Sequence, residues 1–229
     1  MITWLNQWAD QSRFRKFWGI VKEIFWIDQL WIFEFHLKNN DSDNYSDDNL
    51  NNNSDAPAGN DSGIIWKIAT EEDIDRMKCL GCYDIDSKRD AFMKSFVQSH
   101  HEYLLLGIKN ETIHTYAVCA VQAKRMYGLL FRLEEEEAFI SVCFTKPESR
   151  GQGWGPKCIR EICRRCTVIG KKRVFIDIST ANHASIRSAE KSGAAKTDSG
   201  YYCIRIWKKD HLLPFGSYKN RFLSLKKIN

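Results

Sequence analysis

The feature that most constrains this chain is a glycine-rich turn between an apolar run and an amphipathic run. The apolar and β-branched stretch from Ala138 to Phe144 predicts a buried strand. After the turn, apolar residues recur at helical spacing from Ile159 to Ile169, and charged residues occupy the other face. Pro156 suits the first turn of this helix, and Gly170 suits the position just past its end. The turn therefore joins a strand to a helix.

The turn itself, residues 150–155, reads Arg-Gly-Gln-Gly-Trp-Gly. Glycine tolerates positive φ and lets a ligand approach the backbone, and the first N–H groups of a helix have no partner inside it. Such donors at the positive end of a helix dipole favour a phosphate or diphosphate, and Arg150 adds a positive charge. The alternative is a tight turn whose glycines serve packing alone. Pro156 argues against a P-loop, and Lys157 stands where a dinucleotide fingerprint has its third glycine.

A second motif follows the next predicted strand, Arg173 to Ile178. It reads Asn-x-x-Ser from Asn182 and Glu-Lys-x-Gly from Glu190. Asn182 is a good N-cap and the final glycine a good terminator, so a capped helix without chemistry is the alternative. With both motifs in this order, the chain resembles the GCN5-related N-acetyltransferase (GNAT) superfamily over roughly Ile64 to Lys208.

This resemblance implies an α/β (α+β) fold with a mixed central β-sheet flanked by helices, extended at the N-terminus by a helix and a strand. It implies acetyl-CoA as co-substrate, held between the splayed parallel strands Phe139 to Phe144 and Arg173 to Ile178, with no metal. The cofactor contacts that it implies lie at the end of the first strand, in the turn and in the last helix: Cys143, Phe144, Thr145, Arg150, Gly151, Gln152, Gly153, Trp154, Gly155, Pro156, Asn182 and Ser185.

The activity implied is transfer of the acetyl group to a primary amine by direct attack in a ternary complex. An ammonium cannot attack a thioester, so a base must first remove a proton. The candidates are Glu135 and Glu137, because family members often use a carboxylate near this point. We predict Glu137, since period two places it on the same side as Ser141 and Cys143. The alternative is that residues 134–137 are a solvated run of charge.

The proton donor for the leaving thiolate departs from the family pattern. Many members carry a tyrosine two residues before the lysine of the second motif, and this chain has Ala189 there. We predict Tyr201 as the substitute, with Tyr202 or water as alternatives. The missing tyrosine also keeps open a catalytically degenerate domain that binds CoA for regulation, and a transferase that takes a longer acyl chain is a third possibility.

The acceptor implied is a small-molecule amine. An aromatic N-terminal helix with an added strand before the domain is similar to acetyltransferases encoded with cell-envelope polysaccharide genes, which implies an amino sugar. A peptide or a polyamine would also suit the acidic residues 134–137. The net charge of +5 is spread among 34 basic and 29 acidic side chains, so we expect no nucleic-acid partner.

Most of the cysteines lie within apolar strand or helix patterns, where a reduced thiol behaves as a small hydrophobe. The pairs Cys79-x-x-Cys82 and Cys163-x-x-Cys166 could form a zinc site, but the second pair falls inside the amphipathic helix. We therefore predict a reduced, cytoplasmic protein. Charged residues near the N-terminus argue against a signal peptide, and no apolar run is long enough to span a membrane.

The sequence divides into four predicted parts: residues 1–38, an amphipathic helix and a strand; 39–63, a flexible Asn/Asp-rich loop; 64–209, the acetyltransferase domain; and 210–229, a basic tail without an assigned role. The aromatic and basic helix at residues 4–25 would pack on its own domain or a second subunit, or lie on an anionic membrane surface. We expect the strand Trp31 to Leu37 to form a hairpin with Ile64 to Ile68. The domain should then contain helices at 70–80 and 88–99, and strands at 103–109, 112–122, 135–144 and 201–207.

Overall fold

The computed structural model describes residues 25–37, 63–79, 94, 95, 97, 98, 102–126, 129–207 and 209–224. Its strands are β1 Phe25–His36, β2 Ile65–Ile68, β3 Glu102–Lys109, β4 Thr112–Ala120, β5 Ala123–Met126, β6 Leu129–Arg132, β7 Glu137–Thr145, β8 Arg173–Ser179, β9 Ala195–Ile206, β10 Lys209–Phe215 and β11 Phe222–Ser224. Its helices are α2 Glu71–Cys79, α4 Trp154–Val168 and α5 His183–Lys191, with short 3₁₀ helices η2 Pro147–Ser149 and η3 Lys219–Arg221. From residue 64 to residue 179 the predicted strands and helices are found wherever these residues are described, and the structure adds one hairpin, β5–β6, that was not predicted.

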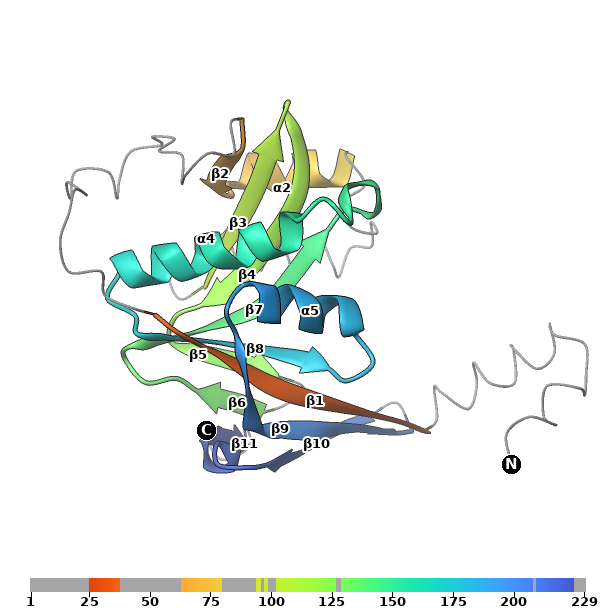
Figure 1. Cartoon of the computed structure of the whole chain (residues 1–229). Coiled ribbons are helices and arrows are strands. Elements are labelled where there is room, and N and C mark those ends of the chain that lie inside the picture. The colour runs from red at the N-terminus through yellow and green to blue at the C-terminus, as the bar shows by residue number, and fades with distance from the viewer. Residues whose placement is uncertain are drawn as a thin grey trace, which may run out of the picture.

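Within the described residues, one mixed sheet runs in the order β10-β9-β1-β8-β7-β4-β3-β2, and a small second sheet runs β11-β6-β5. Helices α4 and α5 cover one face of the large sheet and α2 covers the other (Figure 1). Neighbouring residues of β3 show why both faces need a cover, because Leu105 packs under α4 whereas Leu104 and Leu106 pack under α2. The predicted fold class is confirmed.

Strand β1 does not form the predicted hairpin with β2. It lies between β8 and β9 and is antiparallel to both, whereas β2 pairs with β3 at the far edge of the sheet. Four strands, β8, β7, β4 and β3, separate the two. The physical reason is burial on both faces: Ile32 and Phe33, neighbours in β1, are 0% and 1% exposed. Such a strand fits the interior of a sheet better than an edge hairpin.

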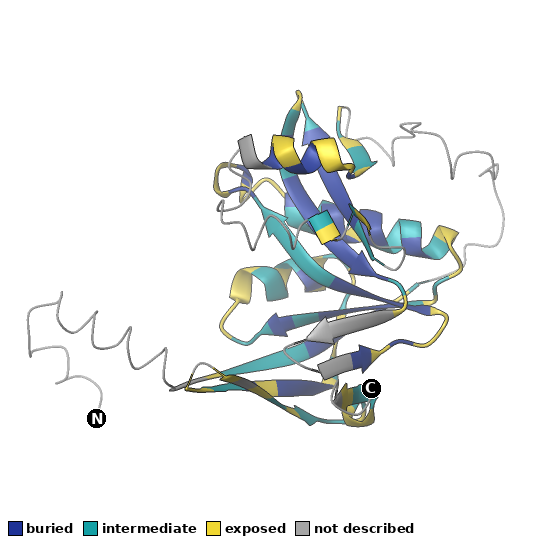
Figure 2. Ribbon diagram, turned by 180° about the vertical axis from the view of Figure 1, so that it is seen from behind, coloured by how far each residue is buried: buried dark blue, intermediate teal, exposed yellow. Residues whose placement is uncertain are grey.

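The C-terminal region is part of the fold rather than a tail beyond it. Strand β10 extends the large sheet next to β9, and β11 pairs with β6. Aromatic packing explains the second contact, since the Phe222 ring lies 5.0 Å from Phe131 and 5.7 Å from Tyr201. Figure 2 shows this C-terminal layer against the buried central strands. The sequence analysis found no signal for these pairings, nor for the β5–β6 hairpin.

Three predicted segments fall outside the part of the chain that the structure describes: the helix at residues 4–25, apart from Phe25 at the start of β1; the Asn/Asp-rich loop except Gly63; and most of the helix at 88–99. Among the described helices, none has the length and apolar content that crossing a membrane requires.

The parallel strands β7 and β8 pair over only part of their length. Their register runs from Glu137 opposite Arg173 to Ile140 opposite Ile176 and then stops. On its other side β7 carries an extra residue, Ser141, because Val142 and Ile140 pair with the adjacent residues Val118 and Cys119 of β4. A bulge of this kind bends a strand and increases its twist, so β7 turns away from β8 beyond Ile140. We call residues 137–140 with 173–176 the paired end, and residues 141–145 with 177–179 the split end.

Candidate active site

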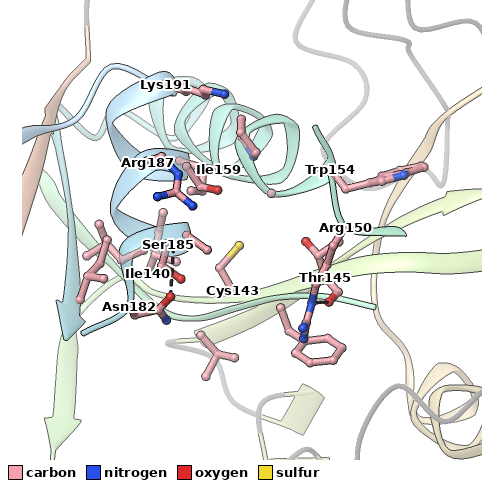
Figure 3. Close-up of a pocket in the computed structure, with 18 of the residues that line it drawn as sticks. Ile140, Cys143, Thr145, Arg150, Trp154, Ile159, Asn182, Ser185, Arg187 and Lys191 are labelled. Atoms are coloured by element: carbon pink, nitrogen blue, oxygen red, sulfur yellow. Dashed lines mark hydrogen bonds between the residues drawn. The ribbon is translucent and has the colours of Figure 1, made fainter. Parts of the chain in front are cut away.

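A cleft of about 730 Å³ opens at the split end, between β7, β8, the glycine turn and α5 (Figure 3). All of the predicted cofactor contacts line it except Gln152, whose side-chain amide donates to the Glu148 carbonyl at 3.1 Å. The glycine turn, two strands and a second helix thus meet around one cavity, as the two sequence motifs predicted.

The floor of the turn is the N-terminus of α4. The N-cap residue Gly153 has φ +81° and Gly151 has φ +79°, values that favour glycine, and no side chain caps the helix. The first backbone bond of the helix runs from the Lys157 N–H to the Gly153 carbonyl at 3.2 Å, so the preceding N–H groups are not used within the helix. A Cβ on Gly155 would lie 3.2 Å from the Ser188 hydroxyl oxygen, which explains the third glycine.

The side chain of Trp154 is an anchor for this turn rather than part of the cleft surface. Trp154 is 5% exposed, and Figure 3 shows its ring pointing away from the cavity. It stacks on His114 at a centroid distance of 4.4 Å and meets Trp66 edge-on at 6.5 Å. His114 in turn bonds to the Ser149 hydroxyl at 2.7 Å. Trp154 therefore contributes its backbone to the cleft and its ring to the rigidity of the turn.

Three cationic side chains line the cleft, and the sequence analysis identified only Arg150. Its Nε donates to the Thr145 carbonyl at 3.3 Å. Arg187 and Lys191 extend from α5, one turn apart (Figure 3). The predicted cap of that helix is confirmed, because the Asn182 side-chain oxygen accepts from the Ser185 N–H at 3.1 Å. The i, i+4 spacing of the two cations on this helix is the signal that could have identified them.

The wall formed by β7 carries polar side chains, among them Ser141 and Cys143. Ser141 Oγ is buried, and no hydrogen-bond partner for it exists within the described residues. The Cys143 thiol lies between the α5 side chains and Arg150 (Figure 3). Its hydrogen bond to Cys158, together with burial, raises the pKa of the Cys158 thiol. Ser141 is the first residue of β7 after its pairing with β8 ends, and we call this point the apex of the cleft. A buried hydroxyl without a hydrogen-bond partner can bind a polar ligand atom there.

Glu137, predicted as the base, lies at the paired end and not among the residues that line the cleft. Its side chain is 1% exposed and forms ion pairs with Arg173 and Arg221. Arg173 also approaches Glu34 at 3.7 Å, and Glu34 accepts a hydrogen bond from Tyr218 at 2.9 Å. The period-two argument gives the face of β7 on which Glu137 lies and does not distinguish the two ends of that strand. This position does not support Glu137 as a base for an acceptor in the cleft.

Tyr201, predicted as the acid, is 1% exposed and also does not line the cleft. Its hydroxyl donates to Asp177 Oδ2, and Asp177 does line the cleft. Tyr201 is therefore linked to the cleft through this carboxylate, which the sequence analysis did not identify.

The first pair of the alternative zinc site lies outside the part of the chain that can be assessed, because neither Cys82 nor the side chain of Cys79 is described. Within the described residues, no group of three or more potential ligands is arranged to hold a metal ion. Burial raises the pKa of Cys163 to about 12, which keeps this thiol protonated. Cys166 instead contacts Cys119, at an S–S separation of 3.8 Å, and the Tyr103 hydroxyl at 3.6 Å.

Comparison with known proteins gives one family and a set of similar folds. Residues 67–194, more than half of the chain, match the model of the acetyltransferase (GNAT) family. Among solved structures, a GNAT-family acetyltransferase from Colwellia psychrerythraea has a TM-score of 0.50 and 13% identity, over 79% of this chain and 55% of that one. The aminoglycoside antibiotic 6'-N-acetyltransferase from Acinetobacter baumannii has a TM-score of 0.47 and 16% identity, over 57% and 90%. A search of curated proteins finds no match.

Proposed function

The chain belongs to the acetyltransferase (GNAT) family, and from that premise we propose that it transfers the acetyl group of acetyl-CoA to a primary amine of a small molecule. The observation that carries the proposal is the cleft at the split end. It combines unpaired helix N–H groups, three cations and an orphaned hydroxyl in a single cavity.

The residues of the cleft fit coenzyme A. The diphosphate suits the N-terminus of α4, where backbone N–H groups and the helix dipole favour a doubly charged group. Arg187 and Lys191 extend this positive surface along α5 and suit the remaining phosphate. The pantetheine arm suits the strand edge from Cys143 to Thr145, which β8 leaves unpaired at the split end. When bound, acetyl-CoA would supply the activated acetyl group.

The protein's own contribution to catalysis would be positioning. Holding the thioester at the apex and the amine beside it converts a bimolecular reaction into one within a complex. Our candidate acceptor is an amino sugar, on the basis of the N-terminal aromatic residues and the strand β1 added before the domain. We also propose a cytoplasmic location, because Cys119, Cys143, Cys158, Cys163 and Cys166 are reduced thiols.

A second candidate function is CoA binding without catalysis. The observation that favours it is the absence of both predicted catalytic side chains, Glu137 and Tyr201, from the cleft lining, together with a buried Ala189 where many relatives have a tyrosine.

One assay separates the two functions. Release of free thiol from acetyl-CoA is followed with a panel of amino sugars, polyamines and peptides, and the molecular masses of the products are measured by mass spectrometry. We expect thiol release that depends on the amine and equals the amount of N-acetylated product. Binding of CoA by calorimetry with no amine-dependent thiol release would instead support the non-catalytic function. Faster turnover with a longer acyl-CoA would show that the preferred donor is this longer acyl-CoA and not acetyl-CoA.

A further inference from the structure

Asp177 alone carries a carboxylate among the described residues that line the cleft. The other charged side chains there are the cations Arg150, Arg187 and Lys191. Within the described part of the chain, Asp177 forms no ion pair with any of them. The protein itself therefore provides no cation for this carboxylate, although three cations line the same cleft. A positively charged ligand group would pair with it.

The position of Asp177 is the apex of the cleft. The last pair of β7 and β8 is Ile140 opposite Ile176, so Ser141 and Asp177 are the first residues of each strand after the separation. The glycine turn marks the other end of the cleft. An arm that starts at the turn and follows β7 from Thr145 to Cys143 ends beside Ser141 and Asp177, so this is where its reactive group would lie.

The orientation of Asp177 is fixed by Tyr201 on β9. The Tyr201 hydroxyl donates to Asp177 Oδ2, and the ring is buried against Phe222 at 5.7 Å. No hydrogen bond to Asp177 Oδ1 is present among the described residues. Two residues further along β8, Ser179 also lines the cleft and donates to Asp28 Oδ1 on β1 at 2.8 Å. The added strand β1 therefore brings a second carboxylate to the same side of the sheet.

Resting on the proposed function, we infer that Asp177 is the catalytic carboxylate that receives the acceptor's ammonium and takes its proton, and that Tyr201 is its positioning residue. One proton passes from the ammonium to Asp177 Oδ1, which leaves a neutral amine. The amine nitrogen forms a bond to the acetyl carbonyl carbon, and the carbon–sulfur bond breaks. The departing thiolate takes up the second proton that the nitrogen loses, and Asp177 returns its proton to water. The acceptor class is thus an amine that is positively charged at neutral pH.

The inference can be tested without knowing the natural acceptor. Two thioethers of CoA differ only in charge at the tail, S-(2-aminoethyl)-CoA with an ammonium and S-propyl-CoA with a methyl group. We expect the unmodified protein to bind the ammonium form about tenfold more tightly by calorimetry, because the tail reaches the Asp177 carboxylate. In Asp177→Asn the two thioethers should bind equally, with the affinity for S-propyl-CoA unchanged. Asp177→Glu should restore part of the preference.

Tyr201→Phe provides a second variant that keeps the charge of Asp177. It should lower the preference to about threefold, because the carboxylate loses the hydrogen bond that fixes its orientation. The matched control is Tyr202→Phe, whose 40% exposed side chain accepts from Gln29 instead. Asp75→Asn, on α2, controls for the change in net charge. Both controls should keep the full tenfold preference.

The outcomes separate this inference from the proposed function. Equal binding of the two thioethers by the unmodified protein, or a preference that survives in Asp177→Asn, overturns the role of Asp177 and leaves CoA binding intact. A full preference in Tyr201→Phe overturns the positioning role. Failure of the unmodified protein to bind either thioether overturns the proposed function first, and the inference with it.

Discussion

The two ends of the β7–β8 pair belong to the same strands but differ in how their polar side chains are paired. At the paired end the strands are bonded to each other, and the buried Glu137 forms ion pairs with the partly exposed Arg173 and Arg221. At the split end the strands part, Ser141 Oγ has no partner within the described residues, and Asp177 is held on one oxygen. Charge is neutralised at one end and left available at the other.

This difference shows that a charged side chain on the expected strand is not sufficient for a catalytic role. Residues 137 and 141 are four positions apart on β7, yet the first belongs to a closed ion-pair network and the second to an open cleft. The bulge at Ser141 marks the change from one to the other. Changes at the paired end should therefore alter stability alone, and changes at the split end should alter ligand binding alone.

The largest expected effect is at the paired end. Glu137→Gln leaves Arg173 and Arg221 facing each other without their carboxylate, so we expect a loss of about 3 kcal/mol in the free energy of unfolding. Urea denaturation measures it. Glu135→Gln, in the exposed part of the same acidic run, should cost less than about 0.5 kcal/mol. A large loss of CoA affinity in a folded Glu137→Gln variant would contradict the claim that the paired end affects stability and not ligand binding.

In the cleft that opens at the split end, removing both cations of α5 should weaken CoA binding without unfolding the protein. We expect Arg187→Ala/Lys191→Ala to raise the Kd about thirtyfold, or about 2 kcal/mol, with an unchanged unfolding midpoint. The loss should shrink at high ionic strength, because salt screens exposed charges. Arg160→Ala, an exposed arginine on α4, is the control. Equal Kd values for the double variant and the control would remove α5 from the cofactor site.

The smallest effect concerns the support behind the cleft, where Glu161 of α4 accepts from Arg164 at 2.8 Å and from Arg165 at 2.7 Å. Burial raises the pKa of Glu161, but the hydrogen bonds from the two arginines outweigh burial and place the pKa below its usual value. The stability that this carboxylate contributes is present above its unfolded pKa of about 4.3 and is lost as the pH falls through the folded pKa.

We therefore expect Glu161→Gln to be about 1.5 kcal/mol less stable than the unmodified protein at pH 7, and this gap to narrow below about pH 4. Urea denaturation across that range measures it. Glu190→Gln, exposed on α5, should follow the unmodified protein at each pH. A gap for Glu161→Gln that stays constant down to pH 3 would show that the ion pairs contribute nothing to stability.

Sequence patterns predicted what depends on neighbours along the chain. The strand, turn and helix around Gly153 were predicted, as were the Asn182 cap and the helix end at Gly170, which has φ +78°. Each follows from residues within a few positions of one another, where backbone geometry limits the choice.

The sequence did not predict what depends on distant segments. Strand β1 pairs with residues at least 137 positions away, from His36 opposite Arg173 upward, and alternation of side chains carries no information about which strand lies alongside. Asp177 on β8 and Tyr201 on β9 form a hydrogen bond across the intervening strand β1, and no local sequence motif connects the two residues. The prediction of Glu137 as the base has the same limit, because only the register with Arg173 shows that this residue lies at the paired end and not among the residues that line the cleft.

The central claim is that the glycine turn binds a diphosphate, and the most direct test places the same substitution at the two ends of α4. Gly153 and Gly170 have φ of +81° and +78°, and a Cβ on either meets no atom closer than 3.9 Å. Gly153→Glu and Gly170→Glu should therefore lose similar stability, about 1 kcal/mol. In calorimetric titration with CoA, we expect Gly170→Glu to bind like the unmodified protein and Gly153→Glu to bind at least about a hundredfold more weakly. Equal affinity in the two variants, or no binding by the unmodified protein, would contradict the account.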